Sequence, residues 1–401
     1  MIRRCSVNCI IPPHILRRML ESSDQAIRDI ALSTLLATTR LRAERRLLAE
    51  FGFLANIAGT KRRTIFDCKN RRLLEQATLV RGEGDSATAD GSVNRAYDGL
   101  GKTYDFFKEV FDRNSIDDRG MRLDGYVHFG RFYNNAFWNG RQMVFGDGDG
   151  RVFSDFTQSL DVIAHELAHG VTEFTAGLEY HNQSGALNES MSDVFGSLVK
   201  QWSLSQTADR ADWLIGADVF SPGIGGDALR SLKSPGNAYN DPIIGRDPQP
   251  GHMDNFVQSP DTEEGDWGGV HINSGIPNHA FFLVATSLGG HAWEGAGHIW
   301  YEALKASGQF TEFQQFADRT YDFAGRLYGT ASVQQQAVRA AWREVGIRIS
   351  GFISPNLPGA GTGRGAKETD TQAVLLKQVE ALAKEVQILS NEVAQLKQGK
   401  V

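Results

Sequence analysis

Features that are scarce in this 401-residue chain exclude several classes of protein. Its only cysteines, Cys5, Cys9 and Cys68, cannot all pair with one another, so they form no disulfide framework. No apolar run is long enough to cross a bilayer, and we expect no membrane partner. The start, MIRRCSVNCIIPPHILRRML, lacks the continuous apolar stretch of a secretory signal peptide because Asn8 and Pro12 interrupt it. We therefore expect a cytoplasmic protein, or one secreted without a classical signal peptide.

The composition is that of a globular protein, with 41% hydrophobic and 22% charged residues, and the length suggests at least two domains. The net charge of −6 hides an asymmetry. Residues 1–75 carry 15 Lys and Arg against 7 Asp and Glu, whereas the remainder carries 27 against 41. A basic arm for nucleic acid is one interpretation. Because this arm has regular apolar spacing and no interleaved aromatics, we favour docking on the acidic body and expect no nucleic-acid partner.

The hydrophobic pattern divides the chain into regions of different secondary structure. Residues 22–50 are predicted to form a helix or helix pair that starts with a capping box at Ser22. Residues 61–151 consist of short β-type runs between Gly, Asn and Asp, which is typical of an antiparallel β-rich domain. Residues 159–348 are mostly helical in pattern. A long Gly-, Pro- and Asp-rich interval at 221–269 interrupts them, and such intervals are usually functional.

The last part of the chain has the pattern of an oligomerisation helix. Residues 353–371 are rich in Gly and Pro and are predicted to be a flexible linker. Within 372–398, Val and Leu alternate in steps of four and three, which places Val at a and Leu at d. That combination favours parallel coiled coils, so we expect a homo-oligomer through 375–396, either dimer or trimer. A lone amphipathic helix that packs on its own protein is the alternative.

The stretch DVIAHELAHGVT, residues 161–172, places two histidines and a glutamate in an otherwise apolar helix. Positions i and i+4 share one helix face, so His165 and His169 can bind the same zinc ion. Glu166 stands where it can take a proton from a water on that ion. A buried helix with satisfied structural histidines would fit these twelve residues as well.

A second helical stretch, GALNESMSDVFGSLV, supplies the third ligand. Glu189 and Asp193 lie one turn apart on the same face, where two buried carboxylates would repel each other unless a cation neutralises them. Zinc can do this for Glu189. Asp193 can accept the free ring N–H of a ligating histidine, as acidic side chains behind metal sites commonly do.

These residues resemble the active-site pattern of the thermolysin family of zinc metalloproteases. HELAHGVTEFTAGLEYHNQSGALNESMSD carries the resemblance, and YNNAFWNG, GDALRSL and GGVHINSGI resemble three more blocks of the family, in the same order. The similarity covers roughly residues 97–347. It implies an α+β, thermolysin-like fold of two domains, β-rich at 57–180 and mainly α-helical at 181–352, with the active-site helix between them. The metzincin pattern is absent, because Thr172 and Thr175 stand where it requires Gly and His.

The resemblance also implies roles for the matching residues. For the metal centre and the reaction these are the zinc ligands His165, His169 and Glu189, the general base Glu166, the oxyanion donors His271 and Tyr180, Asp266, which orients His271, and the supporting residues Asp193 and Asn188. For substrate binding they are Asn135 and Ala136 for the backbone, Arg230 for a carbonyl on the leaving side, and Phe153, Val162 and Leu229 for an apolar pocket. The expected activity is zinc-dependent neutral endopeptidase hydrolysis of peptides and proteins on the amino side of hydrophobic residues.

One departure from the family pattern concerns calcium. The family commonly builds a double calcium site beside its active-site helices, and Asp161 is present for it, but Lys200 stands where an acidic ligand is expected. An ammonium group there could replace the cation, so we do not expect the double site. A single Ca²⁺ near Asp227 and the carbonyls of Phe220 and Ser221 stays open.

The N-terminal arm resembles the short propeptides of the protealysin-like branch, whose PPHIL-type motif is found here at 12–16. Residues 1–56 would then be a removable propeptide, a partner for the body of its own chain, with self-processing as one route to removal. Cys5 or Cys9 could cap the zinc as a thiolate, although structural cysteines are the alternative. The runner-up function is an inactive zinc-site scaffold that assembles through the coiled coil.

Overall fold

The structure is a computed structural model of the chain, and it describes residues 8–48 and 60–350. Its α-helices are α1 (Pro13–Leu20), α2 (Gln25–Leu48), α3 (Gly91–Phe111), α4 (Leu160–Glu173), α5 (Asn182–Ser203), α6 (Asp266–Asn273), α7 (Gly275–Leu288), α8 (His298–Lys305), α9 (Phe313–Tyr328) and α10 (Val333–Glu344). Its strands are β1 (Asn8–Cys9), β2 (Arg63–Asp67), β3 (Thr78–Arg81), β4 (Leu123–Val127), β5 (Ala136–Trp138), β6 (Met143–Phe145), β7 (Leu214–Ile215), β8 (Arg230–Ser231), β9 (Asn240–Asp241) and β10 (Gly245–Arg246). The predicted linker and coiled-coil helix lie outside the described residues.

A six-stranded sheet in the order β1-β5-β6-β4-β2-β3 forms the β-rich part of the molecule. The prediction of an antiparallel domain was wrong for two of its pairings, because β2 runs parallel to β4 and β4 runs parallel to β6. The first parallel pair arises because the chain leaves β2, turns through β3 and returns along α3 before it enters β4. β5 and β6 are antiparallel, and β1 adds to the free edge of β5.

Helix α3 lies inside the region whose pattern predicted strands. Its N-cap is Asp90, whose side chain accepts hydrogen bonds from the backbone N–H of Ser92 and Val93. Gly99 interrupts the helical propensity of its sequence but is needed for packing, because a Cβ there would lie 2.5 Å from Ile163 Cδ1 of α4. Gly99 therefore lowers the helical propensity of the sequence at the point where α3 approaches α4 closely.

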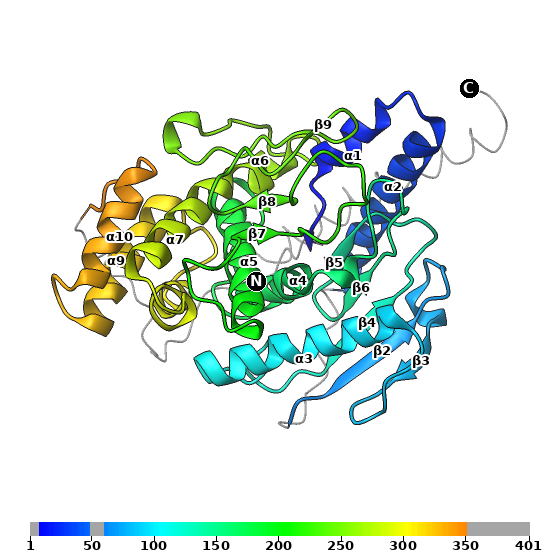
Figure 1. The fold of residues 1–401 in the computed structure, drawn as a ribbon, viewed down its shortest axis with the longest axis horizontal. Helices are drawn as coiled ribbons and strands as arrows, with labels where there is room; N and C mark the ends of the chain where they lie inside the picture. Colours follow the sequence, from blue (N-terminus) through cyan, green and yellow to red (C-terminus); the bar gives the residue numbers. More distant parts are fainter. Residues whose placement is uncertain (1–7, 49–59, 351–401) are drawn as a thin grey trace, which may run out of the picture. The chain divides into compact units, whose positions relative to one another are not determined.

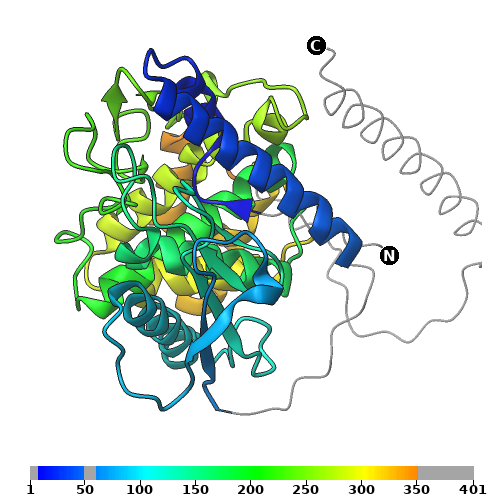
Figure 2. The ribbon, with the colours of Figure 1, turned by 90° about the vertical axis from the view of Figure 1, so that its right-hand side faces the viewer.

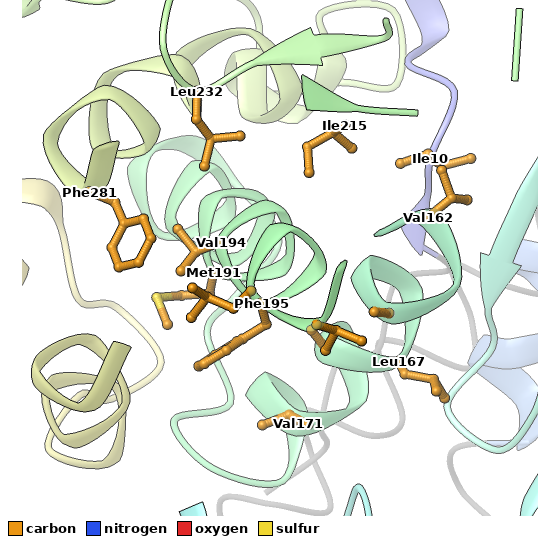
Figure 3. Close-up of a cluster of buried hydrophobic side chains, with 14 of the residues drawn as sticks. Ile10, Val162, Leu167, Val171, Met191, Val194, Phe195, Ile215, Leu232 and Phe281 are labelled. Carbon is orange, nitrogen blue, oxygen red and sulfur yellow. The ribbon is translucent and has the colours of Figure 1, made fainter. Parts of the chain in front are cut away.

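Helices α4 and α5 pack side by side at the centre of the molecule (Figure 1). The contact is close because Gly196 lies on α5 where a Cβ would come within 2.6 Å of the Asp161 carbonyl oxygen. Apolar residues of the two helices, with Leu232 and Phe281 from other elements, form the surrounding core (Figure 3). The two helices that carry the predicted metal ligands are thus fixed by buried packing on most sides.

The N-terminal elements α1 and α2 lie against the body, with α2 extending along its outer surface (Figure 2). α2 was predicted, but its N-cap is Asp24, which accepts hydrogen bonds from Ala26 N and Ile27 N, and not Ser22. Arg42 of α2 forms an ion pair with Glu263. Basic residues of the arm thus contact acids of the body, although one pair, Asp24 with Arg151, has the opposite polarity. Across residues 8–48 and 60–350, no helix is long and apolar enough to span a membrane.

Candidate active site and metal centre

The predicted helix of the HELAH motif is confirmed as α4, and its ligand residues are fully buried. The Nε2 atoms of His165 and His169 lie 3.1 Å apart. Glu189 of α5 approaches both, with its Oε2 atom 3.6 Å from His165 Nε2 and its Oε1 atom 3.4 Å from His169 Nε2. One ligand atom from each residue lies within 4.8 Å of the others, and within the described ranges no other His, Cys, Asp or Glu group of three does so.

The chemistry of this cluster fits a zinc ion. Two imidazoles and one carboxylate are the ligand set of catalytic zinc sites that keep a position open for water. Glu189 Oε2 is buried without a hydrogen-bond partner, which is costly unless a cation binds it. Burial lowers the pKa of His169 to about 3, so its imidazole is neutral, as metal binding requires.

The far sides of the histidine rings are held by residues of α5. His165 Nδ1 lies 2.8 Å from Asp193 Oδ1, as expected for a carboxylate that orients a ligand. His169 Nδ1 donates to Asn188 Oδ1 at 2.7 Å, and Ser192 Oγ lies 3.0 Å from the same nitrogen. Both rings are therefore oriented with Nε2 toward Glu189.

Glu166 lies beside this cluster and against strand β5. Its Oε2 atom accepts a hydrogen bond of 2.9 Å from Trp138 N, while its Oε1 atom is buried without a partner. Burial, and then the neighbouring charge of Glu189, raise the pKa of Glu166 well above its usual range. A buried carboxyl group with one free oxygen is equipped to exchange a proton with a bound water.

Tyr180 and His271 lie on the other side of the metal ligands. The Tyr180 hydroxyl donates to Glu189 and lies 3.2 Å from His271 Nε2. His271 Nδ1 donates to Asp266 Oδ1 at 2.6 Å. Burial alone would lower the pKa of His271, but the carboxylates of Asp266 and Glu189 outweigh it and raise the pKa to about 9. His271 is thus oriented by Asp266, as the resemblance implied, with Nε2 directed into the site.

The predicted backbone-binding residues Asn135 and Ala136 lie at the start of β5, and strand β1 of the N-terminal arm pairs with that strand. Asn8 pairs with Trp138 and Cys9 with Phe137 in an antiparallel register. Ile10 N donates to Ala136 O at 3.2 Å, and Ile11 N donates to Asn135 Oδ1 at 3.0 Å. The structure therefore brings Asn135 and Ala136 together with an extended peptide, the kind of partner that the resemblance implied for them.

Arg230, on β8, joins this peptide to the metal ligands. Its Nε and Nη2 atoms donate to the Asp193 carboxylate, and its Nη1 atom donates to Ile10 O at 3.2 Å. Asp193 in turn contacts His165, so one buried ion pair links the second helix to the peptide. The Asn278 amide, which no sequence motif marked, also donates to Asp193.

The three residues of the predicted apolar pocket, Phe153, Val162 and Leu229, are buried in one core cluster together with Ile10. Ile10 lies beside Val162 at the end of α4 (Figure 3). Sequence reasoning singled out the PPHIL motif at 12–16 but not Ile10, whose position depends on the pairing of β1 with β5.

Cys9 does not join the metal cluster. It belongs to a separate apolar cluster with Ala37, Leu41 and Phe137, and burial raises the pKa of its thiol to about 12. A thiol in that environment stays protonated at neutral pH, whereas zinc binds the thiolate. The structure thus favours a structural role for Cys9, and Cys5 lies outside the described residues.

Lys200 lies at the far side of α5 among acids. Its Nζ atom contacts Asp161 Oδ2 at 3.1 Å and Asp212 Oδ2 at 2.8 Å. Burial alone would lower the pKa of Lys200, but these two carboxylates outweigh it and raise the pKa. The ammonium group thus neutralises the carboxylates of Asp161 and Asp212.

The fold, the His-His-Glu cluster and the adjacent carboxylate define a metallopeptidase. Residues 56–173 match the family described as thermolysin metallopeptidase, catalytic domain, and residues 176–347 match thermolysin metallopeptidase, alpha-helical domain. The chain is 49% identical over 349 residues to an extracellular metalloprotease of Pectobacterium carotovorum subsp. carotovorum, covering 86% of this chain and 97% of that protein. It is 48% identical over 347 residues to protease PrtS of Photorhabdus sp. (strain Az29), covering 85% and 92%.

Among solved structures, the precursor of protealysin, a metalloproteinase from Serratia proteamaculans, superposes with a TM-score of 0.77 at 49% identity, covering 85% of this chain and 99% of that one. The chain belongs to the thermolysin family of metallopeptidases, which confirms the resemblance and the predicted fold class. It is a zinc-dependent neutral endopeptidase made with a propeptide.

Proposed function

We propose that Glu166 is the general base of peptide hydrolysis and that His271 and Tyr180 stabilise the oxyanion. One observation carries this proposal: His271 and Arg230 bond a peptide strand laid along β5, where Glu166 accepts from Trp138 N and Tyr180 lies against His271, all beside the three metal ligands. His165, His169 and Glu189 would hold zinc, which when bound supplies a Lewis acid and lowers the pKa of a coordinated water.

The protein groups then divide the work of the reaction. Glu166 takes a proton from the attacking water and later delivers a proton to the leaving amine. His271 and Tyr180 donate hydrogen bonds to the carbonyl oxygen as it becomes negative. Asp266 holds His271 Nδ1, so that Nε2 carries a proton toward the site.

The same contacts supply the substrate preference. Asn135 and Ala136 hold the backbone by strand pairing, and Arg230 binds the carbonyl that follows the cut bond. A pocket of Phe153, Val162 and Leu229 would receive the residue on the carboxyl side of that bond. Because the pocket is apolar and buried, we expect cleavage on the amino side of hydrophobic residues.

The body of the enzyme is divided into domains at 57–180 and 181–352. In the precursor, residues 1–56 act as an inhibitory propeptide. Occupation of β5 by β1 supports the inhibitory role, because a substrate needs the same edge. The predicted processing site lies outside the described residues, and self-processing remains part of the proposal. The extracellular relative from Pectobacterium supports an exported enzyme.

Three further properties belong to this proposal. Lys200 replaces a cation in the position of the double calcium site, supported by its contacts with Asp161 and Asp212. A single Ca²⁺ near Asp227, Phe220 and Ser221 remains a prediction. Copies of the chain associate through residues 375–396, which sedimentation of the full chain and of a chain ending at residue 352 would test.

The activity is tested with a quenched fluorescent peptide that has Leu after the cleavage point. Processed wild-type protein should cut it, a zinc chelator should stop the reaction, and added zinc should restore it. Glu166→Ala should lower kcat by about 100- to 10,000-fold, whereas Glu173→Gln, at the C-terminal end of the same helix, should not. Properly processed, zinc-loaded protein without activity would instead favour the inactive scaffold.

A further inference from the structure

The backbone of the propeptide lies in the site with the direction that hydrolysis requires. His271 Nε2 donates to the Cys9 carbonyl oxygen at 3.1 Å. The next amide, Ile10 N–H, donates to Ala136 O at 3.2 Å and lies close enough to the Glu166 carboxyl to lower its pKa slightly, against the larger effect of burial. The carbonyl of a peptide bond thus faces an oxyanion donor, while its nitrogen faces the base that would protonate it.

The contacts after this bond follow the same order. Arg230 Nη1 donates to the carbonyl of Ile10, and the next amide, Ile11 N–H, donates to Asn135 Oδ1. A strand of reversed direction would present amides to His271 and Arg230, which can only donate. Four consecutive backbone groups therefore fix both the direction and the register of the segment.

The side chains on both sides of the bond are held as well. Ile10 lies in the buried core cluster with Val162 and Leu229. Cys9 belongs to the apolar cluster that includes Ala37 and Leu41 of α2. The propeptide helix thus contributes to the apolar surroundings of the residue before the bond, and neither residue is exposed.

We propose that the enzyme cuts its own propeptide at the Cys9–Ile10 bond, a processing site distinct from the junction with the mature enzyme. The inference rests on the proposed function, because it uses the same base and donors. One water is consumed: its oxygen bonds the Cys9 carbonyl carbon, the C–N bond breaks, Ile10 nitrogen gains a proton, and Cys9 ends in a carboxylate. The segment is therefore a substrate of its own site.

The cut alone does not free the site, because residues after Ile10 have separate anchors. Thr38 bonds Tyr133 at 2.9 Å, and His14 Nε2 bonds the Tyr239 hydroxyl at 2.9 Å. Arg42 is buried in its ion pair with Glu263. The expected product is therefore a nicked precursor that stays latent until the junction is also cut.

The experiment follows the N-terminus of zinc-loaded full-length precursor by mass spectrometry in H₂¹⁸O. A chain that begins at Ile10 should form with a first-order rate that does not change with protein concentration, as for an intramolecular cut. The released peptide should carry ¹⁸O in the carboxylate of Cys9. Glu166→Gln should form neither product.

Matched variants test the register. Ile10→Asp should reduce this cut at least tenfold, because a carboxylate does not fit the apolar pocket, whereas Ile10→Leu should preserve it. Amide exchange of metal-free precursor gives a readout independent of turnover: Ile10 and Ile11 N–H should be protected in wild type and Ile10→Leu, and exposed in Ile10→Asp.

A Cys9–Ile10 bond that stays intact overturns the proposal. Processed enzyme that still cuts the external peptide would then leave the proposed function standing, with the strand bound unproductively. If the external peptide also survives, both the cut and the proposed function fail. A cut in trans, with a rate proportional to protein concentration, would likewise overturn the assignment of β1 as the substrate of its own site.

Discussion

Replacement of Lys200 by methionine should destabilise the protein strongly for a single change. The side chain of Asp161 is fully buried, and its Oδ1 atom is already used by Ser159 Oγ and Gly216 N. Removal of one partner from a buried ion pair costs about 3–5 kcal/mol. Because Lys200 is 15% and Asp212 45% exposed, we expect the lower end, about 3 kcal/mol. With an unfolding entropy of about 2.1 cal/mol/K per residue over a body of this size, that corresponds to a fall in Tm of roughly 4 °C.

Lys200→Glu extends the same reasoning to calcium. The substitution gathers a new carboxylate with Asp161 and Asp212, close to Asp218, whose pKa burial and then the charge of Asp161 raise. Without calcium the repulsion should destabilise this variant more than Lys200→Met. Added calcium should then raise the free energy of unfolding of this variant, by about 2.7 kcal/mol when free calcium is a hundred times its Kd. The Tm should rise with calcium concentration accordingly.

The assay is thermal unfolding by circular dichroism in a Glu166→Gln background, which prevents self-digestion. Lys305→Met, which removes a 48% exposed lysine on α8, serves as control and should change stability by less than about 0.5 kcal/mol. Two results would show that Lys200 does not replace a cation. One is a Tm of Lys200→Met equal to that of the control variant, and the other is a folded Lys200→Glu whose Tm does not change when calcium is added.

Three further outcomes are expected. The hydrogen bond with Asp147, against the effect of burial, raises the pKa of His128 to about 9, so stability present below pH 6.5 should be lost as pH rises through 9. Urea unfolding of Glu166→Gln should show a fall of about 1–2 kcal/mol in the free energy of unfolding over this pH range, after solvent screening. His128→Gln in the same background should remove this dependence, and the same slope of free energy against pH in both proteins would contradict it. Asn188→Ala should weaken zinc binding about 10- to 100-fold, measured by competition with a chelator; unchanged affinity would exclude Asn188 as support for His169. Removal of zinc should leave far-ultraviolet circular dichroism unchanged while peptide hydrolysis stops; loss of helix signal would show that the metal is also structural.

The metal ligands could be predicted because their geometry is local. His165 and His169 share a helix face by their spacing alone, and Glu189 follows in a second helix of similar apolar pattern. The supporting contacts of Asp193 and Asn188 followed from the same two helices once these packed together. The residues of a site built from two helices close together in the sequence can therefore largely be predicted from their spacing.

Features set by tertiary packing could not be predicted in this way. Gly99 made α3 look unlike a helix, although its missing side chain is what lets α4 approach. The parallel pairing of β2 with β4 depends on the crossover through α3, which the pattern of short strands did not reveal. Asp24 caps α2 in place of Ser22, and the pattern could not separate the two because both residue types suit that role and they lie only two positions apart.

Arg230 explains why the propeptide can be both tightly held and replaceable. Its side chain is only 2% exposed, so every guanidinium donor without a partner would be costly, and Asp193 satisfies only part of the group. The Ile10 carbonyl accepts from Nη1, and a substrate carbonyl at the same point would accept the same hydrogen bond. Exchange of propeptide for substrate therefore conserves this buried interaction, and latency must come from contacts that a substrate lacks. Those are the anchors of α1 and α2, such as Arg42 with Glu263, so weakening them should release activity without altering the catalytic groups.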